Sequence, residues 1–240
     1  MIRALAAVLA LWAGQAAAVS CSDVVFEGQS FTACTVDATT EDLRLFHRDA
    51  AGEVLGGWDA VAAQVAPRKL AFAMNAGMYH DDRRAVGLYI QDGVETAGLV
   101  KRAGPGNFGL LPNGVFCITD NSARVIETLA YDATKPACRD ATQSGPMLVV
   151  GGKLHPKLLA GSDSLNIRNG VGTSADGRSA IFAISNEPVN FHTFARLFRE
   201  VLKTPDALFL DGSVSRLYAP SLNRVDFGFT PLGPIVGVAE

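Results

Sequence analysis

Several short segments of this chain place polar side chains and glycine at the ends of apolar runs. The clearest is an apolar run from Ala207 that ends in Asp211-Gly212-Ser213-Val214-Ser215. Such runs are typical of buried strands, and loops that follow strands often carry binding and catalytic residues. A carboxylate at a strand end can act as an acid, a base, a nucleophile or a metal ligand. An isolated Asp-Gly pair would indicate only a turn, so the interpretation of Asp211 depends on the other segments.

Two further segments have a similar composition. Asn75-Ala76-Gly77 follows an apolar run, and Ser144-Gly145-Pro146 precedes another. The Asn75 amide can both donate and accept hydrogen bonds, and Gly77 lets backbone amides approach a ligand closely. A tight turn at Gly145 would present the Ser144 hydroxyl. Ordinary turn chemistry explains both segments equally well.

The last of these segments is Arg168-Asn169-Gly170, which lies among asparagine and glycine with few acids nearby in sequence. An arginine in this setting is suited to bidentate binding of a phosphate or a carboxylate. A structural salt bridge to a distant acid is the alternative. Further along, Asp176-Gly177 predicts a hairpin turn.

The motifs of several common enzyme classes do not occur in the sequence. It has no glycine-rich nucleotide loop, no serine-hydrolase elbow and no H-E-x-x-H zinc motif. Its histidines, His47, His80, His155 and His192, are far apart in sequence. A metal-dependent phosphodiesterase would need clustered histidines or carboxylates. We therefore expect no cofactor and no metal site.

Short predicted strands outnumber the predicted helices. Helices are expected over Trp58–Val65 and Phe191–Lys203, the second opened by Asn190 as an N-cap. Since strands and helices do not alternate regularly, we expect an α+β fold with a mixed, largely antiparallel sheet core and a single domain. The expected strands are 24–31, 43–47, 70–74, 85–90, 115–119, 124–128, 147–150, 180–184, 207–210 and 235–238.

The first eighteen residues are typical of a secretory signal peptide. Arg3 precedes an apolar stretch, and Ala16-Ala17-Ala18 predicts cleavage before Val19. Lipoprotein processing at Cys21 is disfavoured, because the usual leucine three residues before the cysteine is absent. We expect residues 19–240 to be a secreted or periplasmic domain without an integral membrane segment.

Cysteine content and charge bear on the compartment and on partners. An even number of cysteines in an exported chain predicts two disulfides. Three pairings are possible, and the one that closes the shortest loops is Cys21–Cys34 with Cys117–Cys138. The net charge of −3 and the lack of a basic block predict neither nucleic acid nor an anionic membrane surface as a partner. The oligomeric state is not indicated.

Taken in order, the segments from Leu70 to Tyr218 resemble the phosphodiester glycosidase family. The resemblance rests on Asn75-Ala76-Gly77, Ser144-Gly145-Pro146, Arg168 with Gly172, and Leu210-Asp211-Gly212. It implies hydrolysis of a sugar-1-phosphodiester, with release of the sugar and a phosphomonoester. A small molecule or an envelope glycan would be the substrate.

The resemblance also assigns roles to individual residues. Asp211 would be a nucleophile, a base or a ligand of a sugar hydroxyl, and Arg168 would bind the phosphate and stabilise the leaving group. Glu187 and Asp81 are candidates for a second carboxylate, which ordinary glycoside hydrolysis uses. The expected substrate-binding residues are Asn75, Gly77, Ser144, Gly145, Asn169, Gly212, Ser213 and Ser215.

One part of the sequence departs from the family pattern. Relatives often continue Leu-Asp-Gly with further glycines, whereas this chain continues with Ser213-Val214-Ser215. The loop is therefore bulkier and stiffer than in those relatives. A non-catalytic envelope protein that binds carbohydrate or phosphate is the alternative function.

Overall fold

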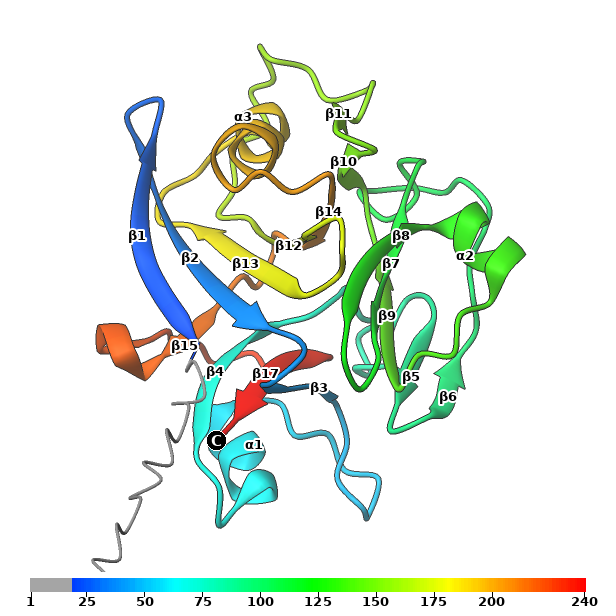
Figure 1. Cartoon of the computed structure of the whole chain (residues 1–240), viewed down its shortest axis with the longest axis vertical. Coiled ribbons are helices and arrows are strands. Elements are labelled where there is room, and N and C mark those ends of the chain that lie inside the picture. Colours follow the sequence, from blue (N-terminus) through cyan, green and yellow to red (C-terminus); the bar gives the residue numbers. More distant parts are fainter. Residues whose placement is uncertain (1–18) are drawn as a thin grey trace, which may run out of the picture.

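The computed structural model describes residues 19–240 and has the predicted α+β class (Figure 1). Within that range, all paired strands are antiparallel, and they form three sheets. We call these the seven-stranded sheet, the β4 sheet and the β7 sheet.

In each sheet the spatial order of the strands differs from their order along the chain. From one edge to the other, the seven-stranded sheet contains β1 (Ser20–Phe26), β2 (Gln29–Asp37), β13 (Ser179–Ser185), β12 (Asn169–Thr173), β14 (Asp206–Asp211), β10 (Met147–Val150) and β11 (Lys153–Leu154). The β4 sheet contains β16 (Arg224–Val225), β15 (Leu217–Ala219), β4 (Leu70–Asn75), β17 (Ile235–Ala239) and β3 (Asp42–Phe46). The β7 sheet contains β6 (Val94–Ala97), β5 (Tyr89–Gln91), β9 (Asp140–Ser144), β7 (Gly114–Ile118) and β8 (Ala123–Glu127).

The three sheets enclose one central hydrophobic core, to which each contributes its inner face. Phe72 of β4, Phe116 of β7 and Phe182 of β13 are fully buried and meet there. The Phe182 ring centroid lies 4.9 Å from that of Phe72 and 5.7 Å from that of Phe116. Since aromatic pairs at these spacings add favourable contact energy, the three rings hold the sheets together at their common centre.

A helix covers the outer face of each sheet, which removes the second apolar face from water. Helix α1 (Trp58–Val65) packs on the β4 sheet, and α2 (Thr128–Thr134) packs on the β7 sheet. Helix α3 (Phe191–Arg196) and the π-helix η1 (Leu197–Val201) cover the seven-stranded sheet. Because β14 is covered on both faces, it is apolar at successive positions, as strands buried on both sides are.

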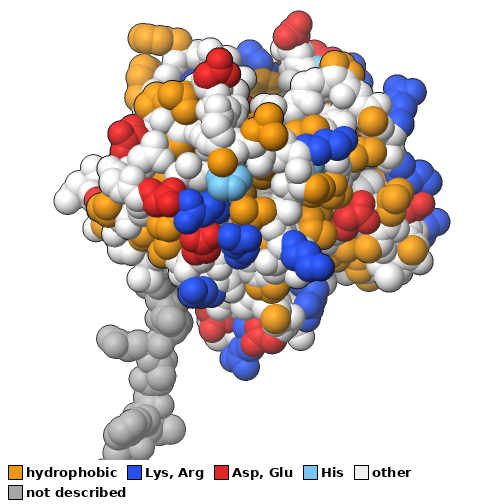
Figure 2. Space-filling model, turned by 90° about the horizontal axis from the view of Figure 1, so that it is seen from above, with side chains coloured by type: hydrophobic (Ala, Val, Ile, Leu, Met, Phe, Trp, Pro, Cys, Tyr) orange, Lys and Arg blue, Asp and Glu red, His pale blue; other side chains and the backbone are white. Residues whose placement is uncertain are grey.

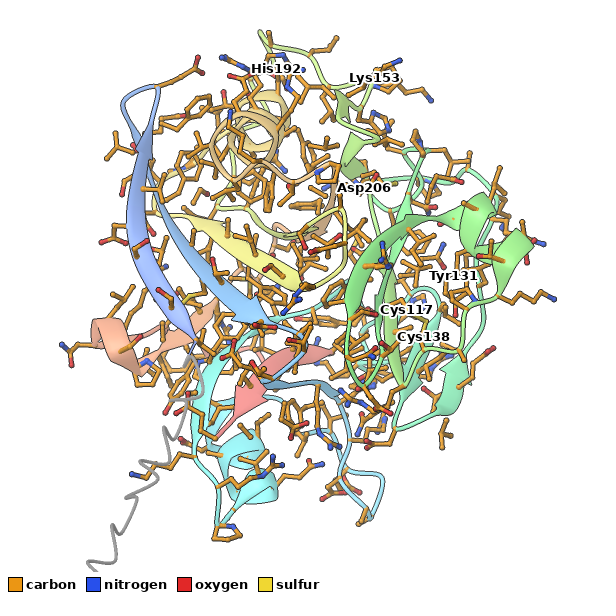
Figure 3. The ribbon with its side chains drawn as sticks, in the orientation of Figure 1. Cys117, Tyr131, Cys138, Lys153, His192 and Asp206 are labelled. Atoms are coloured by element: carbon orange, nitrogen blue, oxygen red, sulfur yellow. A yellow bond between two sulfur atoms is a disulfide. The ribbon has the colours of Figure 1, made fainter. Side chains whose placement is uncertain are left out.

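Both expected disulfides are present. Cys21 and Cys34 face each other across the β1–β2 pair. The second bond links Cys117 of β7 to Cys138, in the segment after α2, with Tyr131 of α2 beside it (Figure 3). The disulfides fit a protein of an oxidising compartment.

Several predicted elements differ from the observed ones. The strand expected over 24–31 is interrupted by a turn, because Glu27 and Gly28 adopt positive φ angles of 53° and 77° and separate β1 from β2. The helix expected over Phe191–Lys203 begins as predicted, with the Asn190 side chain accepting from the Thr193 amide at 2.9 Å. It continues, however, as the π-helix η1, which ends at Val201.

Other elements were not predicted. The strands β9 and β12 were missed because their sequences, DATQS and NGVGT, are polar or rich in glycine although every residue is buried. The helix α2 was missed as well, and Thr128 begins this helix instead of ending a strand. The short 3₁₀ helix η2 (Pro220–Leu222) connects β15 to β16.

The surface seen from above carries Lys and Arg side chains interspersed with Asp and Glu (Figure 2). Among the ion pairs of the described residues, Arg196 of α3 pairs with Glu27 at 2.5 Å and with Glu200 at 2.9 Å. Among residues 19–240, none of the helices combines the length and apolar character that crossing a bilayer requires. The predicted signal peptide, residues 1–18, lies outside the described residues.

Candidate active site

Asp211 is the last residue of β14 and is 6% exposed. Its Oδ1 accepts hydrogen bonds from the backbone amides of Gly212 at 2.6 Å and Ser213 at 2.8 Å. Burial raises the pKa of the Asp211 carboxyl above its ordinary value, although these amide hydrogen bonds oppose the rise. A carboxyl with a raised pKa can exchange a proton closer to neutral pH than an exposed one can.

A register shift lies directly before Asp211, the residue that ends β14. Asn169 of β12 pairs with Asp211 while Gly170 pairs with Phe209, so Leu210 is an extra residue in β14. Bulges of this kind redirect side chains and are frequent next to active sites. The Asp211 amide donates to the Asn169 Oδ1 at 3.0 Å, which fixes the strand end.

Two buried asparagines join the ends of β4 and β12. The Asn169 Nδ2 donates to the Asn75 carbonyl at 2.8 Å and to the Asn75 Oδ1 at 3.2 Å. The Asn75 Oδ1 also accepts from the Arg216 amide at 2.9 Å. The Ser215 hydroxyl donates to the Asp211 carbonyl at 2.9 Å. These contacts, which we call the asparagine clamp, hold both ends of the Asp211 loop.

Arg168 is 1% exposed and lies on the side of the seven-stranded sheet that α3 covers. Its Nε donates to the Val189 carbonyl at 2.9 Å, and its guanidinium carbon lies 3.5 Å from the Phe191 ring centroid. Nη1 has no hydrogen-bond partner within residues 19–240. Burial lowers the pKa of Arg168 to about 10. The arginine therefore stays charged at neutral pH.

The position of Arg168 relates it to the Asp211 loop. Its Nη1 lies 3.7 Å from the point where a Cβ on Gly212 would be. In the described part of the chain, no carboxylate lies within 4.0 Å of this guanidinium. The alternative interpretation of Arg168, a structural salt bridge, thus finds no partner in residues 19–240. The buried charge sits directly beneath the loop.

The other predicted substrate-binding residues lie below the surface. Ser144 is fully buried, and its hydroxyl donates to the Leu210 carbonyl at 2.9 Å instead of being presented in a turn. A Cβ on Gly77 would lie 2.8 Å from the Thr142 Oγ1. A Cβ on Gly145 would lie 2.6 Å from the Asn113 side chain. Both glycines therefore permit close packing beneath the site.

A cleft of about 550 Å³ opens above Asp211. The predicted residues Asp211, Gly212 and Ser213 form one wall of this cleft. Asn75, Asn169, Ser144 and Arg168 do not line it, and instead support that wall from behind. Ser215 lines a neighbouring hollow of about 530 Å³ on the other side of the loop.

Asp211 is the one carboxylate among the described residues that line this cleft. Of the two candidates for a second acid, Glu187 accepts from the Ser30 amide at 2.8 Å, at the β1–β2 hairpin. Asp81 is exposed and lines neither of the two cavities beside the Asp211 loop. Residues 19–240 contain no group of three or more His, Cys, Asp or Glu side chains that could hold a metal.

Tyr79 and Arg83 also line the cleft, and the sequence did not single them out. Burial, together with the negative charge of Asp211, raises the pKa of the Tyr79 phenol. Arg83 lies with its guanidinium carbon 5.0 Å from the Tyr79 ring centroid. Tyr79 follows the Asn75-Ala76-Gly77 segment closely, which is the one sequence signal that pointed toward it.

Comparison with known proteins shows which family the chain resembles along most of its length. Residues 68–239 match the phosphodiester glycosidase family. The chain is 33% identical to the uncharacterized protein YigE of Escherichia coli K12 over 204 residues, which cover 84% of this chain and 80% of that protein.

Two solved structures share the fold. The catalytic domain of zebrafish N-acetylglucosamine-1-phosphodiester alpha-N-acetylglucosaminidase, auto-inhibited by its pro-peptide, matches 92% of this chain and 82% of its own, with a TM-score of 0.64 and 14% identity. A putative exported protein of Burkholderia pseudomallei matches 88% of this chain and 74% of its own, with a TM-score of 0.58 and 11% identity. Because the family match covers most of the sequence, this chain belongs to the phosphodiester glycosidase family.

Proposed function

We propose that this protein hydrolyses a glycosyl-1-phosphodiester outside the cytoplasm. The observation that carries the proposal is Asp211, a buried carboxyl of raised pKa that faces a cleft also lined by Tyr79 and Arg83. Family membership supports the reaction class. The disulfides and the predicted signal peptide support a secreted or periplasmic location.

The reaction breaks the bond between the anomeric carbon and the phosphate oxygen. Water supplies a hydroxyl to the sugar and a proton to the products, which are the free sugar and a phosphomonoester. Positive charge develops on the sugar ring in the transition state, and negative charge develops on the departing phosphate. A site for this reaction needs a carboxylate on the sugar side and positive charge on the phosphate side.

The residues of the cleft, together with Arg168 behind its wall, can meet these needs. Asp211 is the nucleophile or the base, Arg83 is the cation at the cleft surface, and Arg168 adds a buried positive charge beneath Gly212. A phosphate is already a good leaving group, so one carboxylate can suffice without a strong general acid. The Tyr79 phenol lines the same cleft and can exchange its long contact with the Pro231 carbonyl for a hydrogen bond to an oxygen of the substrate.

The test uses purified protein and a panel of glycosyl-1-phosphodiesters in water enriched in oxygen-18. Cleavage of the carbon–oxygen bond puts the label in the released sugar. A phosphodiesterase that attacks phosphorus would put the label in a phosphate product instead. Label in phosphate, or release of a sugar-1-phosphate, would contradict the proposed reaction.

Matched variants test the site. Asp211→Asn should abolish turnover. Arg168→Met should reduce it by about a hundredfold or more, as the loss of one group that stabilises developing negative charge does. Asp81→Asn, a change at an exposed acid, should retain full activity. Unchanged activity of Asp211→Asn would rule out the assigned site. If calorimetry shows glycosyl phosphodiester binding and long incubation yields no product, the non-catalytic binding protein is the correct function.

A further inference from the structure

A second groove of about 570 Å³ adjoins the cleft and shares Arg83 with it. It runs between the start of α1 and the segment that connects β16 to β17. Trp58 and Phe227 give it an apolar wall, and Arg83 and Arg216 give it two positive charges. A ligand bound at Asp211 can therefore extend past Arg83 into this groove.

Arg83 is held at the junction by its backbone. Its φ angle is 68°, an uncommon conformation for a residue other than glycine. The carbonyl of Arg83 accepts a hydrogen bond from the buried His47 Nε2 at 2.6 Å. Unusual backbone conformations that the surrounding structure enforces are enriched at functional sites. The His47 contact thus fixes the direction in which the Arg83 side chain leaves the main chain.

Both the main chain and the side chain of Arg216 have defined contacts. Its amide donates to the Asn75 Oδ1, which ties it to the asparagine clamp under Asp211. Its guanidinium lies against the main chain of Gly228, where an added Cβ would be 2.1 Å from Nη2. A side chain at position 228 would displace the Arg216 guanidinium from this place. The clamp that supports the catalytic loop therefore also positions a cation of the groove.

Neither arginine is neutralised by the acids of the groove. Within residues 19–240, no carboxylate lies within 4.0 Å of the guanidinium of Arg83 or of Arg216. Asp226 is bonded to Arg224 at 2.9 Å and accepts from the Leu217 amide. Asp59 is exposed, in the first turn of α1. The groove thus retains positive charge available to a ligand.

We propose that this groove binds the aglycone of the substrate, and that the aglycone carries a second anionic group, such as a phosphate. The inference rests on the proposed function for the direction of the ligand, since the sugar occupies the Asp211 cleft. Two half-buried guanidinium groups without acid partners are suited to a phosphate or diphosphate. The substrate class is a glycosyl-1-phosphodiester of a phosphorylated alcohol.

The test compares two probes that stand for the product side of the reaction. Calorimetry measures the affinity of glycerol 1-phosphate and of glycerol 1,3-bisphosphate for the intact domain. The bisphosphate should bind about tenfold more tightly or better, as one further charged hydrogen-bonded contact predicts. Arg216→Gln should remove most of this preference, whereas Arg83→Gln, at the junction of the cleft and the groove, should weaken the binding of both probes.

Two further variants separate specific contacts from overall charge. Arg84→Gln removes the same charge at the neighbouring residue, which is paired with Asp82 outside the groove, and should leave the preference intact. Gly228→Ala keeps every charge but displaces the flexible end of Arg216, and should reduce the preference while the unfolding temperature stays close to that of the parent.

The outcomes distinguish this inference from the proposed function. Equal affinity for both probes, or equal loss of preference in Arg84→Gln, would overturn the anionic aglycone site. Hydrolysis of neutral and phosphorylated aglycones at equal rates would overturn it too while leaving the glycosidase function standing. A preserved bisphosphate preference without hydrolysis of any substrate would instead contradict the glycosidase function and retain the groove as an anion site.

Discussion

At the scale of single residues, the environment of Asp211 suits the proposed chemistry but lowers the stability of the folded protein. Its carboxyl is buried without a cationic partner within 4.0 Å in residues 19–240, and its negative charge is held mainly by backbone amides. Burial of a charge without a partner costs free energy. A protein that keeps such a group at the mouth of a cleft gives up stability for chemistry.

We therefore expect Asp211→Asn to be inactive without being less stable. A pKa raised by folding means that the protonated carboxyl is favoured in the folded state, so this stabilisation is lost as pH rises through the folded-state pKa. The asparagine stays neutral and keeps an oxygen for the amides of Gly212 and Ser213. Thermal unfolding at pH 7 should give an unfolding temperature equal to or above that of the parent.

The same comparison at pH 4.5 should show a smaller difference between the two proteins, because the parent is then more protonated. A marked fall in the unfolding temperature of Asp211→Asn at pH 7 would mean that the carboxylate is a structural group.

Sequence patterns indicated Asp211 because a long apolar run stopped on an acid. They did not indicate Tyr79 or Arg83, since nothing in the sequence shows that residues 79 and 83 lie across a cleft from residue 211. Asn75, Asn169 and Arg168 stood out by residue type, yet the structure places them behind the cleft wall. Residue type marks unusual chemistry, whereas exposure to the cleft depends on packing between distant segments.

At the scale of elements, the site is built where strands of two different sheets end together. The asparagine clamp joins β4 of the β4 sheet to β12 of the seven-stranded sheet, because the Asn169 side chain donates to the main-chain carbonyl and to the side chain of Asn75. Such bonds are needed because no ladder connects the two sheets at this point, and buried polar groups of the main chain require partners.

We therefore expect that shortening the Asn75 side chain destabilises the protein more than the small volume removed would suggest. Asn75→Ala leaves the Arg216 amide and part of the Asn169 amide without acceptors, and each unpaired buried group costs about 1–3 kcal/mol. We expect urea unfolding to show a loss of about 2–4 kcal/mol, together with reduced activity. The exposed Asn121→Ala serves as the control and should be nearly neutral. A neutral Asn75→Ala would show that water replaces the clamp.

Elements with clear apolar patterns were predictable and polar ones were not. The strands around 70–74, 207–210 and 235–238 follow from apolar runs, and they are present as parts of β4, β14 and β17. The buried strand β12 contains glycine because its neighbour lies too close for a side chain: a Cβ on Gly170 would lie 2.7 Å from the Leu208 carbonyl oxygen. This requirement arises from the neighbouring strand, so local sequence does not reveal it.

At the scale of the whole molecule, three sheets share one core, and a few ionisable groups are buried between the elements around it. The order of the strands within the sheets could not be predicted from the sequence. For example, β12 pairs with β14, which is distant along the chain, and such pairing leaves no local pattern in the sequence. His47, which follows β3, and His155, which follows β11, are 5% and 2% exposed. Burial lowers the pKa of both imidazoles.

The buried histidines predict that the domain loses stability in mild acid. A histidine whose pKa is lowered by folding contributes stability that is fully present above the unfolded-state value of about 6.5 and is lost as pH falls below it. Each histidine can contribute a slope of up to about 1.4 kcal/mol per pH unit in the free energy of unfolding. Urea unfolding should therefore show lower stability at pH 5.5 than at pH 7.5.

Substitutions that keep a hydrogen bond of each histidine but remove its ionisable ring test whether the histidines cause the acid sensitivity. His47→Gln retains a donor for the Arg83 carbonyl, and His155→Asn retains an acceptor for the Lys157 amide. Each should flatten the dependence of the unfolding free energy on pH between 7.5 and 5.5, whereas His80→Gln, at an exposed position, should leave the slope as it is. The double variant His47→Gln/His155→Asn combines both changes. If its unfolding free energy depends on pH as steeply as that of the parent, the two histidines are not the cause of the acid sensitivity. Carboxylates with pKa values well above their ordinary range would then be the cause.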